Sequence, residues 1–424
     1  MKRKIRIGYV GLGRRGRGVL SACIMQMADV EVAYLCDIHA PAMEAAVALF
    51  EKAGRTVPRQ TADYREILAD GTVDAVFLMT GWDGRMTLVE DSLLAGKYTA
   101  VEVGCAFTLE ECLRVKAAHE KTGAHLMMLE NCCYGRREMM GLRLALEGAF
   151  GELVHCDGGY HHYLPACELF LQKPGEGKHY RLPNYEKRNC EQYPTHALGP
   201  ISKVLGIGRG NRFLSLASFS SKSRGLRAAA EHILGEDSPE AKAEYAQGDI
   251  VTTILTCAGG ETVHLCLDTT LPRAYYSRNF TVRGTLGMYT EERRVLFFEG
   301  MEEKIENNEE EMYKTHDHPL YREYTSGSMQ GGHGGIDYLV CRAFVEAVKR
   351  GEVPPINTYD SLTWMAIAPL SEASIRAGGA PVEFPDFSDG AWQTPGEPLL
   401  SKYSLDAVFE DAGTPIFPAR EDAE

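Results

Sequence analysis

The stretch IRIGYVGLGRRGRG, residues 5–18, decides the fold of the first part of this 424-residue chain. An apolar strand over 5–10 runs into Gly11-x-Gly13-x-x-Gly16, and a helix is expected from about 16 to 27. Gly11 and Gly13 allow a tight turn and a close backbone approach, and Gly16 allows close helix packing. The N-terminus of that helix then faces a pyrophosphate. This pattern predicts a dinucleotide-binding loop.

An acidic residue at the expected distance extends this prediction. Asp37 follows Gly16 by 21 residues and ends a second strand over 30–37. A carboxylate there accepts hydrogen bonds from the adenosine ribose and repels a 2′-phosphate. The sequence therefore favours NAD over NADP, although arginines at 14, 15 and 17 stand close to the loop.

The rest of the first third alternates short β segments with helical patterns, which is typical of stacked βαβ units. Thr108 and Glu111 form a capping-box pattern at the start of one helix. We expect a doubly wound parallel sheet, a Rossmann domain, over residues 1–130. Its further strands are expected at 74–80, 98–103 and 125–131, and its further helices at 40–54 and 108–123.

The pattern changes from about residue 150. Long β segments at 248–270 and 278–300 contain the hairpin turns AGGE and GTLG. They predict a second, α+β domain over 131–424 with a mostly antiparallel open sheet, covered on one face. We expect the acidic stretch 299–318 to be a solvated loop, and a helical pair at about 337–350 and 358–377.

Composition excludes several classes of protein. The net charge of −14 argues against a nucleic-acid partner, and no run of 18 apolar residues predicts a membrane span. The twelve cysteines are scattered without zinc-cluster spacing, as in a reducing compartment. The basic N-terminus runs straight into a strand and does not resemble an export signal. We therefore expect a cytoplasmic enzyme without a structural metal.

A second group of residues suggests proton-transfer chemistry. Within NCEQYPTHALGP, residues 189–200, Tyr193 and His196 lie three positions apart, so a helix start presents them on one face. A histidine hydrogen-bonded in the core is an equally good interpretation of the same pattern. In GGYHHY, strand alternation puts Tyr160 and His162 on one face. These histidines lack the neighbouring carboxylates or thiols of a metal site, and the role of GGHGG at 331–335 stays open.

Ten segments together resemble glycoside hydrolase family 109, a group of NAD-dependent α-N-acetylgalactosaminidases within the glucose-fructose oxidoreductase and inositol dehydrogenase family. The resemblance runs from about residue 4 to 390. Its segments are IGYVGLGRRGRG, VEVGCAFTLEEC, MMLENCCYGRREMM, FGELVHCDGGYHH, YPTHALGPISKVLGIGRGNRF, SSKSRGL, AKAEYAQGDIVTTI, YYSRNFTVRGTLG, GGHGGIDY and VEFPDF.

The resemblance implies hydrolysis through transient oxidation. NAD⁺ takes hydride from C3 of the sugar, and the resulting ketone acidifies the C2 proton. A base removes that proton, the aglycone leaves from C1, water adds, and the hydride returns. Such chemistry requires general acid–base groups on two sides of the ring, which tyrosine and histidine supply.

The resemblance also implies roles for particular residues. Tyr160 is the expected base for the C2 proton, His196 acts on the C3 hydroxyl, Glu130 orients His196, and Tyr193 completes the catalytic group. The cofactor is expected to contact Gly11, Gly13, Arg15, Gly16, Asp37, Trp82, Arg85, Glu102, Val103, Asn131 and Tyr193. The sugar is expected to contact Tyr160, His162, Arg181, Tyr193, Thr195, His196 and Tyr276.

The sequence departs from the family pattern at two places near the expected nicotinamide end. Gly104 stands where the hydrolases carry proline, and WDGR at 82–85 stands where they carry an aromatic residue and a histidine. The lysine that sugar dehydrogenases of the wider family carry after their glutamate is replaced by Val103. The alternatives to a glycosidase are an NAD-dependent sugar dehydrogenase and a non-catalytic NAD(H) or sugar sensor. The resemblance further suggests a homo-oligomer, a dimer or larger.

Overall fold

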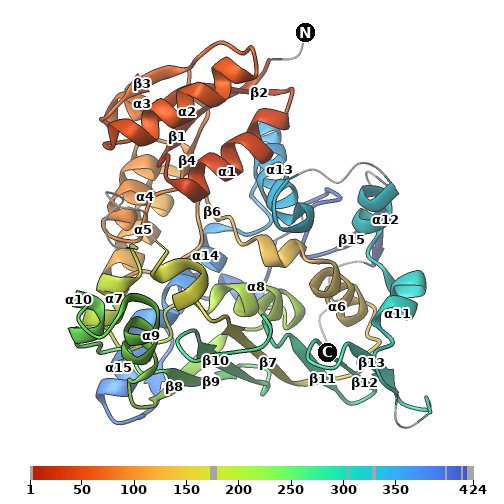
Figure 1. Cartoon of the computed structure of the whole chain (residues 1–424). Helices are drawn as coiled ribbons and strands as arrows, with labels where there is room; N and C mark the ends of the chain where they lie inside the picture. The colour runs from red at the N-terminus through yellow and green to blue at the C-terminus, as the bar shows by residue number, and fades with distance from the viewer. Residues whose placement is uncertain are drawn as a thin grey trace.

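The structure is a computed structural model that describes residues 3–171, 179–302, 305–326, 331–396, 399–411 and 414–417. Two sheets with their helices make up this part of the chain (Figure 1). No helix among the described residues is both long enough and apolar enough to cross a membrane.

The N-terminal sheet contains six parallel strands in the order β3-β2-β1-β4-β5-β6. This order is that of a doubly wound dinucleotide-binding fold, which confirms the predicted fold class. The strands are β1 (Ile5–Val10), β2 (Val30–Cys36), β3 (Arg59–Thr61), β4 (Ala75–Leu78), β5 (Tyr98–Val101) and β6 (Leu126–Met128). The helices between them are α1 (Arg14–Ala22), α2 (Ala40–Lys52), α3 (Arg65–Ala69), α4 (Arg85–Leu94) and α5 (Leu109–Thr122).

Local signals explain most of these boundaries. The predicted capping box is present at α5, where the Thr108 hydroxyl accepts from the Glu111 backbone N–H at 3.2 Å. Helix α1 begins at Arg14, earlier than expected, after the extended N-cap residue Gly13, and it ends at Ala22, where a short 3₁₀ turn (Ile24–Gln26) replaces its expected last part. The three-residue strand β3 was not expected.

The second sheet contains eight strands in the order β13-β12-β11-β7-β10-β9-β8-β14. Only β7 and β10 pair in parallel, so the sheet is mostly antiparallel as predicted. Its strands are β7 (Leu153–His161), β8 (Phe213–Ser220), β9 (Ile250–Cys257), β10 (Thr262–Asp268), β11 (Thr281–Gly284), β12 (Gly287–Thr290), β13 (Val295–Phe298) and β14 (Val382–Glu383).

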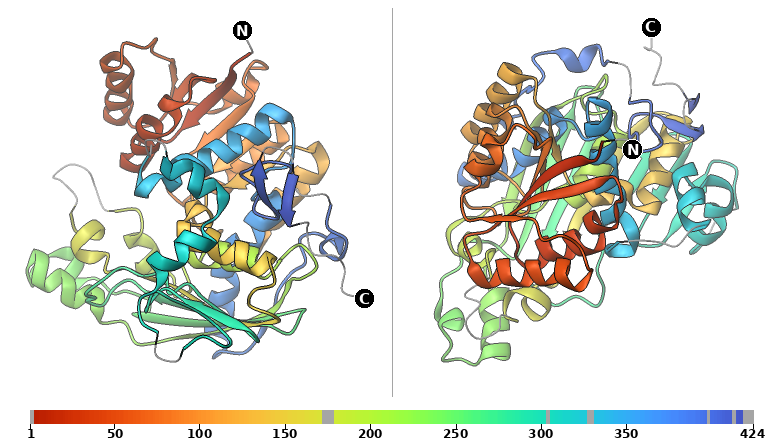
Figure 2. Two further views of the ribbon diagram at one scale, coloured as in Figure 1. Left: turned by 90° about the vertical axis from the view of Figure 1, so that its right-hand side faces the viewer. Right: turned by 90° about the horizontal axis from the view of Figure 1, so that it is seen from above.

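Helices lie on one side of this sheet, between it and the first sheet (Figure 2, left). Helix α8 packs on β7 and on helix α6. The opposite face carries exposed apolar side chains at Leu214, Phe219 and Ile254. The elements between β6 and β14 include α6 (Arg136–Leu146), α7 (Leu182–Lys187), α8 (Thr195–Val204), α9 (Gly225–Leu234), α10 (Pro239–Lys242), a π-helical turn (Pro165–Leu169) and 3₁₀ turns at Asn131–Tyr134 and His333–Gly335. After β14 follow a 3₁₀ turn (Ala391–Gln393) and the hairpin strands β15 (Val408–Asp411) and β16 (Thr414–Phe417).

The chain returns to the first sheet near its end. Helix α13 (Ile336–Arg350) packs on β1 and α1, and its Phe344 meets Phe77 of β4 with ring centroids 5.2 Å apart. Helix α14 (Thr358–Met365) packs on β6 and α5. The predicted division at residue 130 stays a prediction, since helices from the second half complete the packing of the first sheet.

One predicted helix is two helices. Helix α15 (Ile367–Arg376) follows α14 directly, and Pro369 lies in its first turn. Proline has no N–H for the Met365 carbonyl, which instead accepts from the Ala106 backbone N–H at 3.2 Å. The expected continuous helix over 358–377 is therefore interrupted at residue 366.

The acidic stretch is not a solvated loop along its whole length. Residues 309–316 form helix α11 (Glu309–His316), and α12 (Pro319–Ser326) follows it. Glu309 is buried, accepts from the Tyr289 hydroxyl and lies 3.3 Å from an Arg137 nitrogen. Arg137 and Tyr289, which are distant in sequence, thus provide partners that allow Glu309 to be buried, although the acidic residues around it predict exposure.

Candidate active site

The glycine loop has the backbone shape that a dinucleotide requires. Gly11 has a φ of +95°, and a methyl group at Gly16 would lie 2.2 Å from the Gly11 carbonyl oxygen. A methyl group at Gly13 would meet no atom within 4 Å. Asp37 accepts from the Leu12 N–H at 2.6 Å and from the His39 N–H at 2.8 Å, which fixes its carboxylate beside the loop. These residues fit a pyrophosphate at Gly13 and a ribose at Asp37.

Arg15 lies between the two halves of the chain. Its guanidinium donates to Glu102 at 2.9 Å and to both oxygens of Asp337 at 2.6 and 2.9 Å. Asp337 also accepts from the Asn131 amide at 2.7 Å and lies 2.8 Å from His333 Nδ1. Burial opposes its charge, but hydrogen bonds from Arg15 and His333 outweigh that effect and lower the pKa of Asp337.

Asp337 therefore contacts two residues that the resemblance assigns to the cofactor, Arg15 and Asn131, and sequence reasoning missed it. The signal in the sequence that points to it is the glycine-rich stretch GGHGGID, residues 331–337. Gly334 and Gly335 have positive φ angles there, so the chain turns sharply just before α13.

The WDGR loop is held by buried Arg85. Its guanidinium donates to the carbonyl oxygens of Glu102 at 2.6 Å, Val103 at 2.8 Å and Gly81 at 3.1 Å. Gly104 has a φ of +146°, and a methyl group there would lie 2.4 Å from Trp82 Nε1. The two departures from the family pattern are thus one packing unit, because the indole occupies the space that a side chain at 104 would need. The cofactor contacts expected of Trp82, Arg85 and Val103 stay predictions.

His196 and Glu130 form a hydrogen-bonded pair. Glu130 follows β6 and is fully buried, and its Oε1 lies 2.7 Å from Nδ1 of His196 in the first turn of α8. Burial opposes ionisation of Glu130, but the contact with His196 outweighs that effect and lowers the pKa of the carboxyl. An ionised Glu130 holds the proton on Nδ1, which leaves Nε2 as the base.

Aromatic side chains surround that base. The Tyr193 hydroxyl lies 3.4 Å from His196 Nε2. The Tyr193 ring packs against Tyr160, with centroids 4.6 Å apart, and stacks on Trp82 at 6.0 Å. Tyr276 lies edge-on to Tyr160 at 6.1 Å. The structure therefore places Tyr160, Tyr193, His196 and Tyr276 in one cluster, as the sequence predicts, and their roles stay predictions.

Arg181 supplies positive charge to this cluster. It is buried, and its guanidinium carbon lies 4.6 Å from the Tyr193 ring centroid and 5.9 Å from that of Tyr160. One of its nitrogens lies 3.4 Å from Glu168. The other predicted sugar contacts are His162, which is hydrogen-bonded to the Tyr160 hydroxyl at 2.9 Å, and Thr195, which is fully buried at the start of α8.

Three side chains at this position could also form a metal-ligand set. Ligand atoms of Glu130, Cys132 and His196 lie within 4.8 Å of one another. The carboxylate and the imidazole face each other as a hydrogen-bonded pair, and burial raises the pKa of the Cys132 thiol well above its ordinary value. A buried neutral thiol is a poor metal ligand, so the geometry favours a proton-transfer pair.

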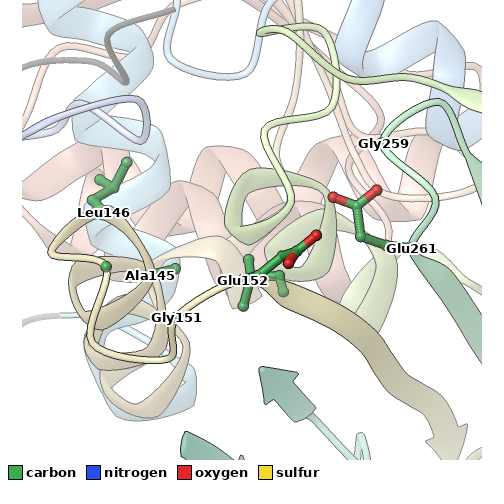
Figure 3. A pocket seen from close by; sticks show the side chains of 8 residues that line it. Ala145, Leu146, Gly151, Glu152, Gly259 and Glu261 are labelled. Atoms are coloured by element: carbon green, nitrogen blue, oxygen red, sulfur yellow. The ribbon is translucent and has the colours of Figure 1, made fainter. Parts of the chain in front are cut away.

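A separate surface hollow lies far from the aromatic cluster. It has a volume of about 290 Å³ and is lined by residues from the end of α6, the start of β7 and the β9–β10 turn (Figure 3). Glu152 and Glu261 point toward it. Leu153 lines it at one end of β7, whereas Tyr160 stands near the other end of the same strand. It is therefore not part of the candidate active site.

Comparisons with known proteins agree with this geometry. Residues 134–394 match the family described as "Glycosyl hydrolase 109, C-terminal domain". The chain belongs to glycosyl hydrolase family 109. Residues 5–130 of this family 109 member match "Oxidoreductase family, NAD-binding Rossmann fold". A family 109 protein of Stenotrophomonas maltophilia is 36% identical over 92% of this chain and 90% of its own length. An α-N-acetylgalactosaminidase of Tannerella forsythia is 34% identical over 92% of this chain and 87% of its own length.

Solved structures share the fold at low identity. A levoglucosan dehydrogenase in complex with NADH and L-sorbose aligns with a TM-score of 0.67 and 18% identity, covering 91% of this chain and 100% of its own. An inositol dehydrogenase homolog from Azotobacter vinelandii in complex with NAD⁺ aligns with a TM-score of 0.66 and 16% identity, covering 91% and 98%. These likenesses show that the two-sheet architecture is shared with dehydrogenases, and they do not assign a substrate.

Proposed function

We propose that this family 109 member is an NAD-dependent glycosidase that hydrolyses α-linked N-acetylgalactosaminides through transient oxidation at C3. One observation carries the proposal: Tyr193 lies in contact with both the His196–Glu130 pair and Tyr160, so the two proposed bases belong to one site. The relative from Tannerella forsythia, named as an α-N-acetylgalactosaminidase, supports the choice of sugar.

The residues present suit oxidation better than direct displacement. Direct glycoside hydrolysis uses two carboxyl groups on opposite sides of the scissile bond. In this cluster the reactive groups are an imidazole and phenols, and the carboxylate of Glu130 is bonded to His196 Nδ1. Such groups transfer protons to and from carbon atoms and hydroxyl groups, and both oxidation at C3 and elimination across C1 and C2 require proton transfers of this kind.

Each residue then has one task. His196 Nε2 takes the proton of the C3 hydroxyl while Glu130 holds the opposite nitrogen. When bound, the dinucleotide would supply the chemistry of hydride removal from C3 and of its later return. Tyr160 receives the C2 proton that the C3 ketone makes acidic, the aglycone leaves from C1, and water replaces it. Arg181 stabilises negative charge that develops on the phenols.

The glycine loop, Asp37 and the Arg15 network are the residues that would hold NAD(H). We further propose a cytoplasmic location, which the twelve free cysteines support. Leu214, Phe219 and Ile254 on the open sheet face support a homo-oligomer that pairs through this face. A Phe219→Asp variant that keeps the mass of the wild-type oligomer in light scattering would contradict that pairing.

The test of the activity uses p-nitrophenyl α-N-acetylgalactosaminide in D₂O, with and without added NAD⁺. We expect nitrophenolate release, no accumulation of NADH, and deuterium at C2 of the released sugar. Nitrophenolate release without deuterium at C2 would indicate direct displacement and contradict the proposal. NADH accumulation with an intact glycosidic bond would identify a sugar dehydrogenase, and binding of NAD(H) or sugar with no turnover of any glycoside would identify a sensor.

A further inference from the structure

The Tyr160 hydroxyl has a partner that the proposed steps do not use. Tyr160 lies near the end of β7, and His162 follows the strand, with its backbone N–H donating to the Asp268 carbonyl oxygen at 2.9 Å. This pairing continues the strand alternation, so both side chains lie on the same face. Tyr160 Oη lies 2.9 Å from His162 Nδ1, and the two rings meet edge-on at 5.5 Å.

Cys167 selects the direction of that hydrogen bond. Its thiol donates to the Tyr163 carbonyl oxygen at 3.1 Å, so its sulfur lone pairs are free to accept. Nε2 of His162 lies 3.5 Å from this sulfur. When Nε2 carries the proton and donates it to the sulfur, Nδ1 is bare and accepts from the Tyr160 hydroxyl. The turn at Pro165–Leu169, which carries Cys167, thus offers Nε2 an acceptor and favours this tautomer of His162.

Tyr160 needs such an acceptor to work as a base. A phenol that still holds its proton cannot take a second one. Burial raises the pKa of Tyr160 above its ordinary value, although Arg181 acts in the opposite direction, so free tyrosinate is costly at neutral pH. Burial lowers the pKa of His162, which keeps the imidazole neutral and ready to accept.

The charges around His162 come from three other elements. Glu168 in the π-helical turn raises its pKa, whereas Arg181 before α7 and His196 in α8 lower it. Tyr276, between β10 and β11, packs edge-on to the imidazole with centroids 5.1 Å apart. Glu168 therefore favours an imidazolium at His162, whereas Arg181 and His196 disfavour it.

We propose that His162 is a positioning residue that takes the phenolic proton of Tyr160 in the same step in which Tyr160 takes the C2 proton of the sugar. The C2–H bond breaks, its electron pair enters the enolate of the C3 ketone, and a new O–H bond forms at Tyr160. The original phenolic proton passes to His162 Nδ1, which becomes an imidazolium. After water addition the two transfers reverse: Tyr160 gives C2 a proton that has exchanged with solvent, and it takes a proton back from His162 Nδ1. This inference rests on the proposed function.

Three variants separate hydrogen bonding from proton acceptance. His162→Asn keeps an acceptor oxygen near the place of Nδ1 but cannot hold the proton. His162→Gly removes the group and leaves space for added imidazole. His161→Asn is the matched control, because His161 lies on the opposite face of β7, beside Glu292.

The measurements compare proton exchange at C2 with hydride transfer from C3, in the full-length enzyme with NAD⁺ bound. We expect His162→Asn to slow deuterium entry at C2 about 100-fold, the lower range for loss of a general base, with single-turnover hydride transfer from C3 changed less than about threefold. We expect the kinetic isotope effect for the C2-deuterated substrate to rise. Imidazole should restore His162→Gly, more strongly as pH rises through the pKa of the added imidazole.

Several results would overturn the inference. His162→Asn with wild-type C2 exchange would show that Tyr160 does not need this acceptor. Equal loss of hydride transfer and C2 exchange in His162→Asn and His162→Gly, without rescue by imidazole, would show a structural role only. Wild-type enzyme that neither releases nitrophenolate nor exchanges C2 would instead remove the proposed function, and this inference with it.

Discussion

Glu191 is a buried carboxyl two residues before Tyr193, and its replacement by glutamine should stabilise the fold. It is only 1% exposed, and its Oε1 accepts from the Tyr193 backbone N–H at 3.3 Å. Among the described residues its Oε2 has no hydrogen-bond partner. Burial raises the pKa of Glu191 to about 8. At neutral pH the folded protein therefore keeps this proton, whereas the unfolded chain loses it.

The sign and size of the effect follow from that difference. Because the unfolded chain releases the proton near its ordinary pKa of 4.5, folding stability falls as pH rises above that value and levels off above about 8. The cost to the native state is about 1 kcal/mol near pH 5 and about 4 kcal/mol near pH 8, from about 1.4 kcal/mol per pKa unit. Glutamine keeps the acceptor for Tyr193 and does not titrate.

The assay is urea unfolding of the wild type and Glu191→Gln at several pH values between about 5 and 8. The variant should gain stability over the wild type progressively with pH, by about 3 kcal/mol across this range. Glu244→Gln, at an exposed carboxyl, is the control and should show no such trend. A difference between Glu191→Gln and wild type that stays constant with pH would refute the reasoning, since it would mean that Glu191 does not titrate differently in the two states.

Three further changes test the site. Glu130→Gln should lower kcat by about 10²–10⁴-fold with little change in KM, because an amide no longer holds the His196 tautomer; an equal rise in KM would point to a binding role. Gly104→Ala should destabilise the fold by about 1–3 kcal/mol and weaken NADH binding, because the φ of Gly104 is +146° and Trp82 fills the space that the methyl group needs. Thermal unfolding and NADH fluorescence titration measure the two effects. Gly96→Ala is the control in both assays, because Gly96 has a positive φ but open space around it. Asp337→Asn should weaken NADH binding about tenfold by releasing Arg15, and an unchanged dissociation constant would show that the Arg15 network does not shape the cofactor loop.

Local sequence predicted the elements that depend on neighbouring residues. The glycine loop, the strand alternation and the Thr108–Glu111 capping box each involve residues close in the chain, and each is present in the structure. The Tyr193–His196 pair belongs to the same class, because their spacing brings them together at the start of α8. The aromatic cluster could be anticipated from these segments and from the family resemblance.

Contacts between distant residues could not be predicted in this way. Arg15 and Asp337 are 322 positions apart, and nothing near either residue shows that they meet. Helix α11 was missed for the same reason, since Arg137 and Tyr289 remove Glu309 from solvent. The packing at Gly104 also depends on a distant partner, because the indole of Trp82 occupies the space that a side chain at 104 would need.

The position of Glu130 explains how one fold serves two kinds of chemistry. Glu130 directly follows Met128 and Leu129 at the carboxyl end of β6, the edge at which doubly wound sheets bind their ligands. His196 reaches it from α8, which packs on β7, the strand that carries Tyr160. In the proposed function, the base for the C3 hydroxyl is thus anchored to the first sheet and the base for C2 to the second. A sugar held between them meets hydride transfer and C2 proton transfer at adjacent carbons, and a dehydrogenase needs only the first. The presence of Tyr160 with its acceptor His162 is therefore the feature by which this site would extend oxidation to bond cleavage.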